Sequence, residues 1–122
     1  MITFRPLDPT FAIDQQIGIE AEPVVLVNIF LLERSDEAQF LKVWHDDATV
    51  MKSQPGCISI QLHRALGENA TYLNYAVWES NAAFRAAFSN PEFRSGLAAY
   101  PSTSITMPHL FQKVAVAGIC TA

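Results

Sequence analysis

The first half of the chain combines one continuous apolar run with a segment of helical spacing. Residues 24–32 (VVLVNIFLL) are almost all apolar and mostly branched, which is typical of a strand buried on both faces. From residue 36 onward, apolar residues recur every three or four positions and Ser35 is a suitable N-cap, so we predict a helix over Asp36–Gln54. Pro55-Gly56 ends this helix. Its apolar stripe comprises Phe40, Leu41, Trp44, Ala48 and Met51.

Two segments with alternating polarity follow and predict a β-hairpin. In Cys57–Arg64, the alternation puts Ile58 on the same face as Ile60, with polar side chains on the other face. A turn over Leu66–Ala70 separates this strand from the next one, Thr71–Trp78.

The last third of the chain predicts two helices and a final strand. Ser80 can cap a helix that continues through the apolar positions 82–88. A second short helix is expected over about Pro91–Tyr100, because proline suits a first helical position. We then expect a loop over Pro101–Pro108 and a strand over His109–Ala117.

The resulting order β-α-β-β-α-β is that of the ferredoxin-like α+β fold. Right-handed crossovers place both helices on one face of a four-stranded antiparallel sheet. The other face would be too apolar for a soluble monomer, so we expect a homodimer whose sheets pack face to face. We assign an N-terminal arm with one short strand to residues 1–22, the domain to 23–118 and a tail to 119–122. The apolar outer face would comprise Val25, Val27, Ile29, Leu31, Leu73, Tyr75 and Val77.

Composition narrows the class of protein further. The chain has 122 residues, of which 50% are hydrophobic and 16% charged, and this fits one globular domain. A net charge of −4 without any Lys/Arg cluster gives no support for nucleic-acid binding. The apolar runs are too short for a membrane span and the N-terminus lacks a signal-peptide pattern, so we expect a cytoplasmic protein. Cys57 and Cys120 are expected to be free thiols.

The strand Thr71–Trp78 carries the polar residues that most need an explanation. Asn74 and Trp78 share one face of it, and Asn28 lies in the middle of the first strand. If these strands are neighbours, the two amides can approach each other. They then either satisfy each other's hydrogen bonds or line a small-molecule pocket, and the sequence leaves both interpretations open.

Histidines are the other candidates for chemistry near neutral pH. His45 is expected at the surface, whereas His63 and His109 lie on strands and are more often structural than catalytic at such positions. No His, Cys, Asp or Glu cluster has metal-ligand spacing, so we expect no metal. Glycine-rich phosphate loops and the GxSxG motif are absent from the sequence.

Residues Pro23 to Val116 resemble the antibiotic biosynthesis monooxygenase (ABM) domain, a dimeric α+β barrel. The resemblance rests on VVLVNIF, FLKVWHDDATVMKSQPGCISIQLHR, NYAVWES, AFRAAFSNPEF and HLFQKVAV, in that order. It implies a pocket between sheet and helices and, in members that oxidise polycyclic phenols, oxygen activation without metal, flavin or haem. Asn74 and Trp78 match the Asn and Trp of those members, whose N–H groups hydrogen-bond the oxyanion or the peroxy intermediate.

Two departures from the family pattern bear on the reaction. Phenol-oxidising members carry a Tyr six residues after the Trp, where this chain has Phe84. Haem-degrading relatives use an Asn that Asn28 resembles, but also a His where this chain has Phe88, so haem degradation is disfavoured. The proton acceptor stays open, with His63 and Tyr72 as candidates. The candidate substrate-binding residues are Asn28, Trp44, Phe84, Phe88 and Phe111.

The leading hypothesis is a cofactor-independent monooxygenase that oxidises an aromatic phenol or quinol with O2. One alternative is a dimer that binds or senses a small molecule without converting it. The other is a dimeric-barrel isomerase that transfers protons. Turnover separates the first hypothesis from the second, and a reaction that proceeds without O2 would identify the third.

Overall fold

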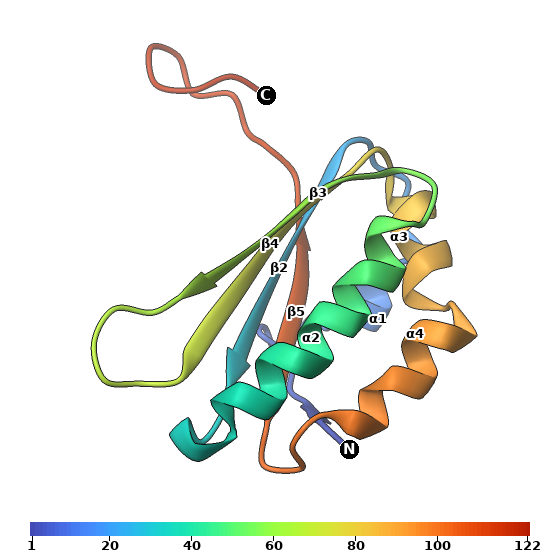
Figure 1. Cartoon of the computed structure of the whole chain (residues 1–122). Helices are drawn as coiled ribbons and strands as arrows, with labels where there is room; N and C mark the ends of the chain where they lie inside the picture. The colour runs from blue at the N-terminus through green and yellow to red at the C-terminus, as the bar shows by residue number, and fades with distance from the viewer.

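A sheet of five strands forms the centre of the structure, and the main helices lie on one of its faces (Figure 1). The structure, a computed structural model, describes residues 1–122. The strands are β1 (Thr3–Phe4), β2 (Val24–Leu31), β3 (Cys57–Arg64), β4 (Thr71–Trp78) and β5 (Ile105–Phe111). The helices are α1 (Ile13–Gln16), α2 (Glu37–Lys52), α3 (Asn81–Phe88) and α4 (Pro91–Gly96), with 3-10 turns at Arg34–Asp36 and Leu97–Ala99.

The strand order β5-β2-β4-β3, with antiparallel neighbours throughout, is the ferredoxin-like arrangement that the sequence predicts. Helices α2, α3 and α4 cover the same face of this sheet (Figure 1), as right-handed crossovers require. β2 and β4 are neighbours in the centre of the sheet, and their register sets Asn28 directly opposite Asn74.

Of the two N-caps that the sequence predicts, Ser80 of α3 is confirmed and Ser35 of α2 is wrong. The side chains of Ser80 and Asn90 accept hydrogen bonds from backbone N–H groups in the first turns of α3 and α4. Ser35 does not cap α2. It lies in a 3-10 turn closed by the Asp36 N–H, and the helix begins at Glu37. The hydrogen bonds of that turn replace the predicted cap.

The last strand corrects the sequence prediction. β5 spans Ile105–Phe111, so the predicted loop 101–108 contains four of its seven residues and the predicted strand 109–117 begins too late. Pro108 is tolerated inside β5 because the two-residue β1 leaves the outer edge unpaired at that point. At the other end, β2 begins at Val24 and provides no partner beyond Phe111, so residues 112–122 leave the sheet as an exposed tail (Figure 1).

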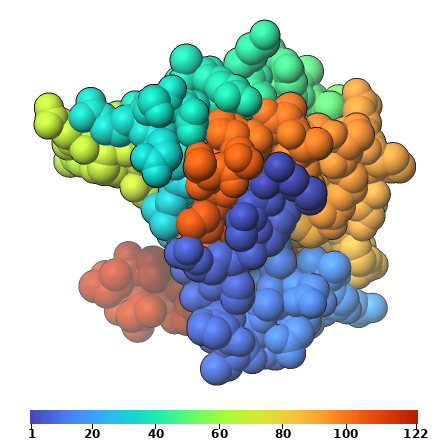
Figure 2. All heavy atoms as spheres, turned by 90° about the horizontal axis from the view of Figure 1, so that it is seen from below, coloured from blue at the N-terminus to red at the C-terminus, as the bar shows by residue number.

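The N-terminal arm packs on its own domain. Thr3–Phe4 pairs in parallel with Ile105–Thr106, which adds a fifth strand to the four predicted. Figure 2 shows the arm, in blue, lying across the lower end of the molecule beside the orange segment that precedes β5. The side-chain amide of Gln16 in α1 donates to the Leu110 carbonyl at 3.0 Å and accepts from the Leu110 N–H at 2.9 Å. These two hydrogen bonds replace those that a neighbouring strand would make with β5.

A β-bulge changes the predicted face of one residue in β3. The register shifts between Cys57 and Ser59, so Ile58 is the extra residue of the bulge. Ile58 is 58% exposed, whereas Ile60 packs against the core. The alternation predicted from the sequence therefore holds only from Ser59 onward.

The core lies between the sheet and the helices, and the opposite face of the sheet is uncovered (Figure 1). One buried cluster contains Trp78 and Phe84, and a second surrounds Phe40. Of the residues predicted on the outer face, Val25 is buried within the protomer. The others remain partly or fully exposed: Val27, Ile29, Leu31, Leu73, Tyr75 and Val77.

Candidate active site

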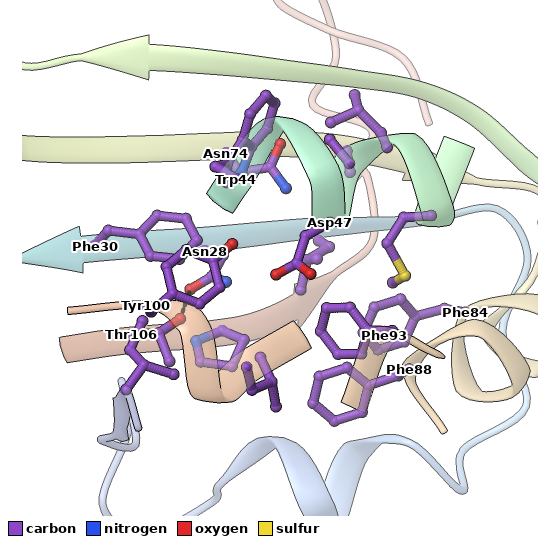
Figure 3. Close-up of a pocket in the computed structure, with 18 of the residues that line it drawn as sticks. Asn28, Phe30, Trp44, Asp47, Asn74, Phe84, Phe88, Phe93, Tyr100 and Thr106 are labelled. Carbon is purple, nitrogen blue, oxygen red and sulfur yellow. Dashed lines mark hydrogen bonds between the residues drawn. The ribbon is translucent and has the colours of Figure 1, made fainter. Parts of the chain in front are cut away.

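A cavity lies between the sheet and helices α2, α3 and α4 (Figure 3). Fifteen of its twenty lining residues are hydrophobic, and its empty space, including the part open to solvent, is about 650 Å³. Phe84, Phe88 and Phe93 gather on one side of it. An apolar cavity with a few fixed polar groups is the usual form of a small-molecule site.

Two amides lie opposite each other on the sheet wall of the cavity. The Thr106 hydroxyl donates to Oδ1 of Asn28 at 2.7 Å, which fixes the orientation of this amide and leaves its Nδ2 as a donor. Asn74 is 8% exposed and its Oδ1 has no hydrogen-bond partner. The two amides therefore do not satisfy each other, and the interpretation of Asn28 and Asn74 as a ligand site is the one the geometry favours.

Trp78 follows Asn74 by four residues on the same face of β4. Its side chain is buried, and its ring packs edge to face on Phe84 with 5.8 Å between centroids. The indole Nε1 has no acceptor. Because a buried indole N–H usually finds a partner, this donor is available to a molecule in the cavity.

Asp47 brings a carboxylate into this apolar cavity from α2 (Figure 3). It is 7% exposed, and its Oδ2 has no hydrogen-bond partner. Burial raises the pKa of Asp47 to about 6, while the Tyr100 hydroxyl opposes this shift and the charge of Asp46 adds to it. Burial and the negative charge of Asp47 both raise the pKa of Tyr100, which therefore stays a neutral phenol.

Unpartnered buried polar atoms concentrate at this cavity. Six such side-chain atoms occur in the chain, and three of them belong to lining residues: Asp47 Oδ2, Asn74 Oδ1 and Trp78 Nε1. Folded proteins leave few buried polar groups unsatisfied, so a cluster of three around one cavity indicates a site built to hold a polar ligand.

Most of the site residues proposed from the sequence line the cavity, and three do not. Those that line it are Asn28, Trp44, Asn74, Trp78, Phe84 and Phe88. His63 is exposed, with Nδ1 3.3 Å from the Leu73 carbonyl. Tyr72 is buried outside the cavity, and its hydroxyl donates to Glu37 at 2.8 Å. Burial, and to a lesser extent this hydrogen bond, raises the pKa of Tyr72. Phe111 is exposed and packs edge to face on the His109 ring.

Sequence reasoning missed three polar residues of the site: Asp47, Tyr100 and Thr106. Asp47 lies three residues after Trp44 and four before Met51, so the helical spacing places it on the apolar stripe of α2. This spacing is the sequence feature that indicates a buried position. Thr106 falls in the segment 101–108 that the sequence predicts as a loop, so its place on a strand facing the cavity was not predicted. For Tyr100, no local pattern distinguishes a cavity residue from an ordinary core residue.

The remaining features concern ions and membranes. No group of three or more His, Cys, Asp or Glu side chains is placed to hold a metal ion. No helix combines the length and the apolar character needed to cross a bilayer. The polar atoms of the cavity come from amide, indole, carboxyl and hydroxyl groups.

Comparison with known proteins reveals similarity in both sequence and fold. The sequence profile of the family described as antibiotic biosynthesis monooxygenase matches residues 23–99. The chain belongs to the ABM family. It is 32% identical over 94 residues to the deoxynogalonate monooxygenase of Streptomyces nogalater, covering 77% of this chain and 79% of that protein.

Solved structures of other proteins share the fold of this chain. SnoaB, a cofactor-independent oxygenase from Streptomyces nogalater, superposes with a TM-score of 0.71 and 30% identity, over 80% of this chain and 99% of SnoaB. The Mycobacterium tuberculosis protein Rv0793 has a TM-score of 0.67 at 14% identity, over 79% of this chain and 99% of its own, and shows the fold alone. The ABM chain described here is thus related to cofactor-independent monooxygenases.

Proposed function

We propose that this ABM protein is a cofactor-independent monooxygenase that oxidises a small aromatic phenol or quinol with O2. The observation that carries the proposal is the pair Asn74 and Trp78, whose buried polar atoms have no partner and line an apolar cavity. Similarity to a deoxynogalonate monooxygenase and to a cofactor-independent oxygenase supports it.

The polar groups of the cavity suit the charge that develops in such a reaction. Removal of a phenolic proton makes the ring electron-rich enough to reduce O2. The N–H groups of Asn28, Asn74 and Trp78 can then hydrogen-bond the oxyanion, and fixed donors in an apolar cavity stabilise such a charge strongly. For an anthrone-type substrate, a CH2 group becomes a carbonyl, one oxygen atom enters the product and the other leaves with both hydrogens as water.

Oxygen uptake with anthrone-type and hydroquinone-type compounds tests the proposal. We expect Asn74→Ala and Trp78→Phe each to lower kcat by about 100-fold, because each removes a donor from the developing charge. Asn69→Ala is the matched control, since Asn69 lies in the exposed turn between β3 and β4 and donates only to Leu66. Equal rates for wild type and the Asn74→Ala, Trp78→Phe double variant would contradict the assigned roles.

Two other outcomes would identify a different function. Thermal stabilisation by the aromatic compounds without any turnover would indicate a binding or sensing protein. Product formation under anaerobic conditions would indicate a proton-transfer isomerase, because the proposed oxygenase has no other electron acceptor.

The active unit of the proposed enzyme is a homodimer with the small aromatic molecule bound in each protomer. The uncovered sheet face supports this assembly, since Tyr75 and Phe111 are 39% and 42% exposed there and no helix covers them. The exposed tail adds further apolar surface at Val114 and Ile119. Packing of two sheets face to face would bury the apolar side chains of both.

A further inference from the structure

The helix wall of the cavity carries one group that the proposed function does not yet use. Asn28, Asn74 and Trp78 all belong to the sheet, whereas Asp47 projects from α2 on the other side (Figure 3). A flat ring bound between the two layers would meet N–H donors on the sheet side and a carboxylate on the helix side. The cavity therefore offers a bound phenol both hydrogen-bond donors and a carboxylate acceptor.

The surroundings of Asp47 contain no cation that would neutralise it. The lining residues from the sheet, α3, α4 and the N-terminal arm include no Lys, Arg or His. On α2 itself, His45 and Asp46 are exposed and pair with each other. Arg94 of α4 lies over the Phe88 ring at 4.3 Å from its centroid. Tyr100 is the other ionisable group at the cavity, and it stays neutral.

The two oxygen atoms of the Asp47 carboxyl group have different surroundings. Gly96 approaches Oδ1 so closely that a Cβ on this residue would lie 2.5 Å from it. Oδ2 is buried in the cavity wall without any partner. A buried aspartate that served only the fold would be expected to pair with a cation or a backbone N–H, whereas the only group that stabilises the charge of Asp47 is the Tyr100 hydroxyl.

We propose that Asp47 is the proton acceptor of the site and takes the phenolic proton of the substrate on Oδ2. This inference rests on the proposed oxygenase function. In the step, the substrate O–H bond breaks, an O–H bond forms on Asp47, and the electron pair stays on the substrate oxygen. The ring then reduces O2, which is the oxidant. The oxygen atom that leaves as water takes the proton returned from Asp47 and the hydrogen of the ring carbon that becomes a carbonyl. Tyr100 is a positioning residue beside the carboxyl group.

Anaerobic binding tests the acceptor without requiring turnover. The probes are 1-naphthol and its methyl ether, 1-methoxynaphthalene, which differ in the single O–H that Asp47 would bind. At about pH 7 we expect wild type to prefer the phenol by about tenfold, because a hydrogen bond to a carboxylate is strong. This preference should fall as pH decreases through about 6, where Asp47 becomes protonated, and should be independent of pH in Asp47→Asn.

Turnover provides the second measurement. We expect Asp47→Asn to lose about 100-fold or more in kcat for weakly acidic phenols, and much less for nitrophenols that already ionise in water. A pH-independent preference in wild type, or an Asp47→Asn variant with the wild-type pH profile, overturns the inference. If Asp47→Asn fails to fold, the wild-type binding series still decides it.

The two proposals fail in different ways. If wild type and Asp47→Asn oxidise the substrate equally fast, the proposed oxygenase function is supported and the role of Asp47 as proton acceptor is contradicted. If wild type oxidises none of the compounds but still prefers 1-naphthol in a pH-dependent way, Asp47 is supported as the group that binds the phenol. The proposed oxygenase function is then contradicted.

Discussion

Asp47 sits in the cavity at a cost to folding, because its pKa is higher in the folded chain than its ordinary value of 3.8. The folded state holds the proton up to about pH 6, whereas the unfolded chain releases it near 3.8. Between these values the unfolded state binds fewer protons, so ionisation of Asp47 lowers the free energy of unfolding as pH rises. The penalty is complete above about pH 6 and absent below 3.8.

Asp47→Asn should therefore stabilise the protein at neutral pH. The pKa shift corresponds to at most about 3 kcal/mol, and we expect a gain of about 1–3 kcal/mol near pH 7 that disappears near pH 4. Urea unfolding at several pH values measures it. Asp14→Asn is the matched control, since Asp14 is an exposed aspartate on α1 and lies outside the cavity. A gain that does not change between pH 4 and 7 would contradict the assigned burial of the charge.

Single residues of the site differ in how far the sequence reveals them. Asn74 and Trp78 could be predicted because alternation along a strand fixes which residues share a face. Asp47 is harder to predict, because its spacing places it on the apolar stripe of α2 whereas most carboxylates on a helix point into water. The type of side chain alone makes His63 and Tyr72 candidates, and the structure places neither of them in the cavity.

At the scale of elements, the packing of α4 on α2 holds the Asp47 carboxylate. Gly96→Ala would put a methyl group 2.5 Å from its Oδ1. Alanine gains up to about 1 kcal/mol in a helix, but the overlap costs about 1–3 kcal/mol, so we expect a net loss of stability and a lower kcat. Gly18→Ala is the control, because its added Cβ would meet nothing within 4 Å. Thermal melts and oxygen uptake measure both effects, and wild-type behaviour of Gly96→Ala would contradict them.

The N-terminal arm closes part of the cavity, since Ile2 and Phe4 line it and the Phe4 ring lies 6.4 Å from that of Phe88. We expect Phe4→Ala to widen this end and raise kcat/KM for a tricyclic over a bicyclic phenol by about tenfold. Phe11→Ala is the matched control, with a ring on the same arm that is similarly exposed but outside the cavity. An unchanged ratio in Phe4→Ala would show that the arm does not limit substrate size.

Elements with strong local signals were predicted within a few residues, and β5 was not. The alternating strands β3 and β4 and the capped helix α3 carry their signals in their own sequence. The limits of β5 depend on its neighbours: β2 ends its pairing at Phe111, and the short β1 makes Pro108 acceptable. Such limits are set by tertiary pairing, which a local pattern does not contain.

At the scale of the whole molecule, the proposed dimer rests on the uncovered face of the sheet. Val27 lies at its centre, between Tyr75 of β4 and His109 of β5, and points away from the helices. A carboxylate at this position is tolerated by a monomer in water but would be buried between two packed sheets at high cost. We therefore expect Val27→Glu to convert the dimer into a folded monomer.

Light scattering with circular dichroism tests this prediction. Leu66→Glu is the matched control, because Leu66 is 96% exposed in the turn between β3 and β4, away from the centre of the sheet, and should leave the dimer intact. A wild type that is monomeric at micromolar concentration contradicts the assembly outright. A Val27→Glu variant that stays dimeric places the interface elsewhere, for example on the tail. Since the cavity lies on the helix side of each protomer, we expect the folded monomer to retain its affinity for 1-naphthol, and loss of that affinity would mean that dimerisation shapes the site.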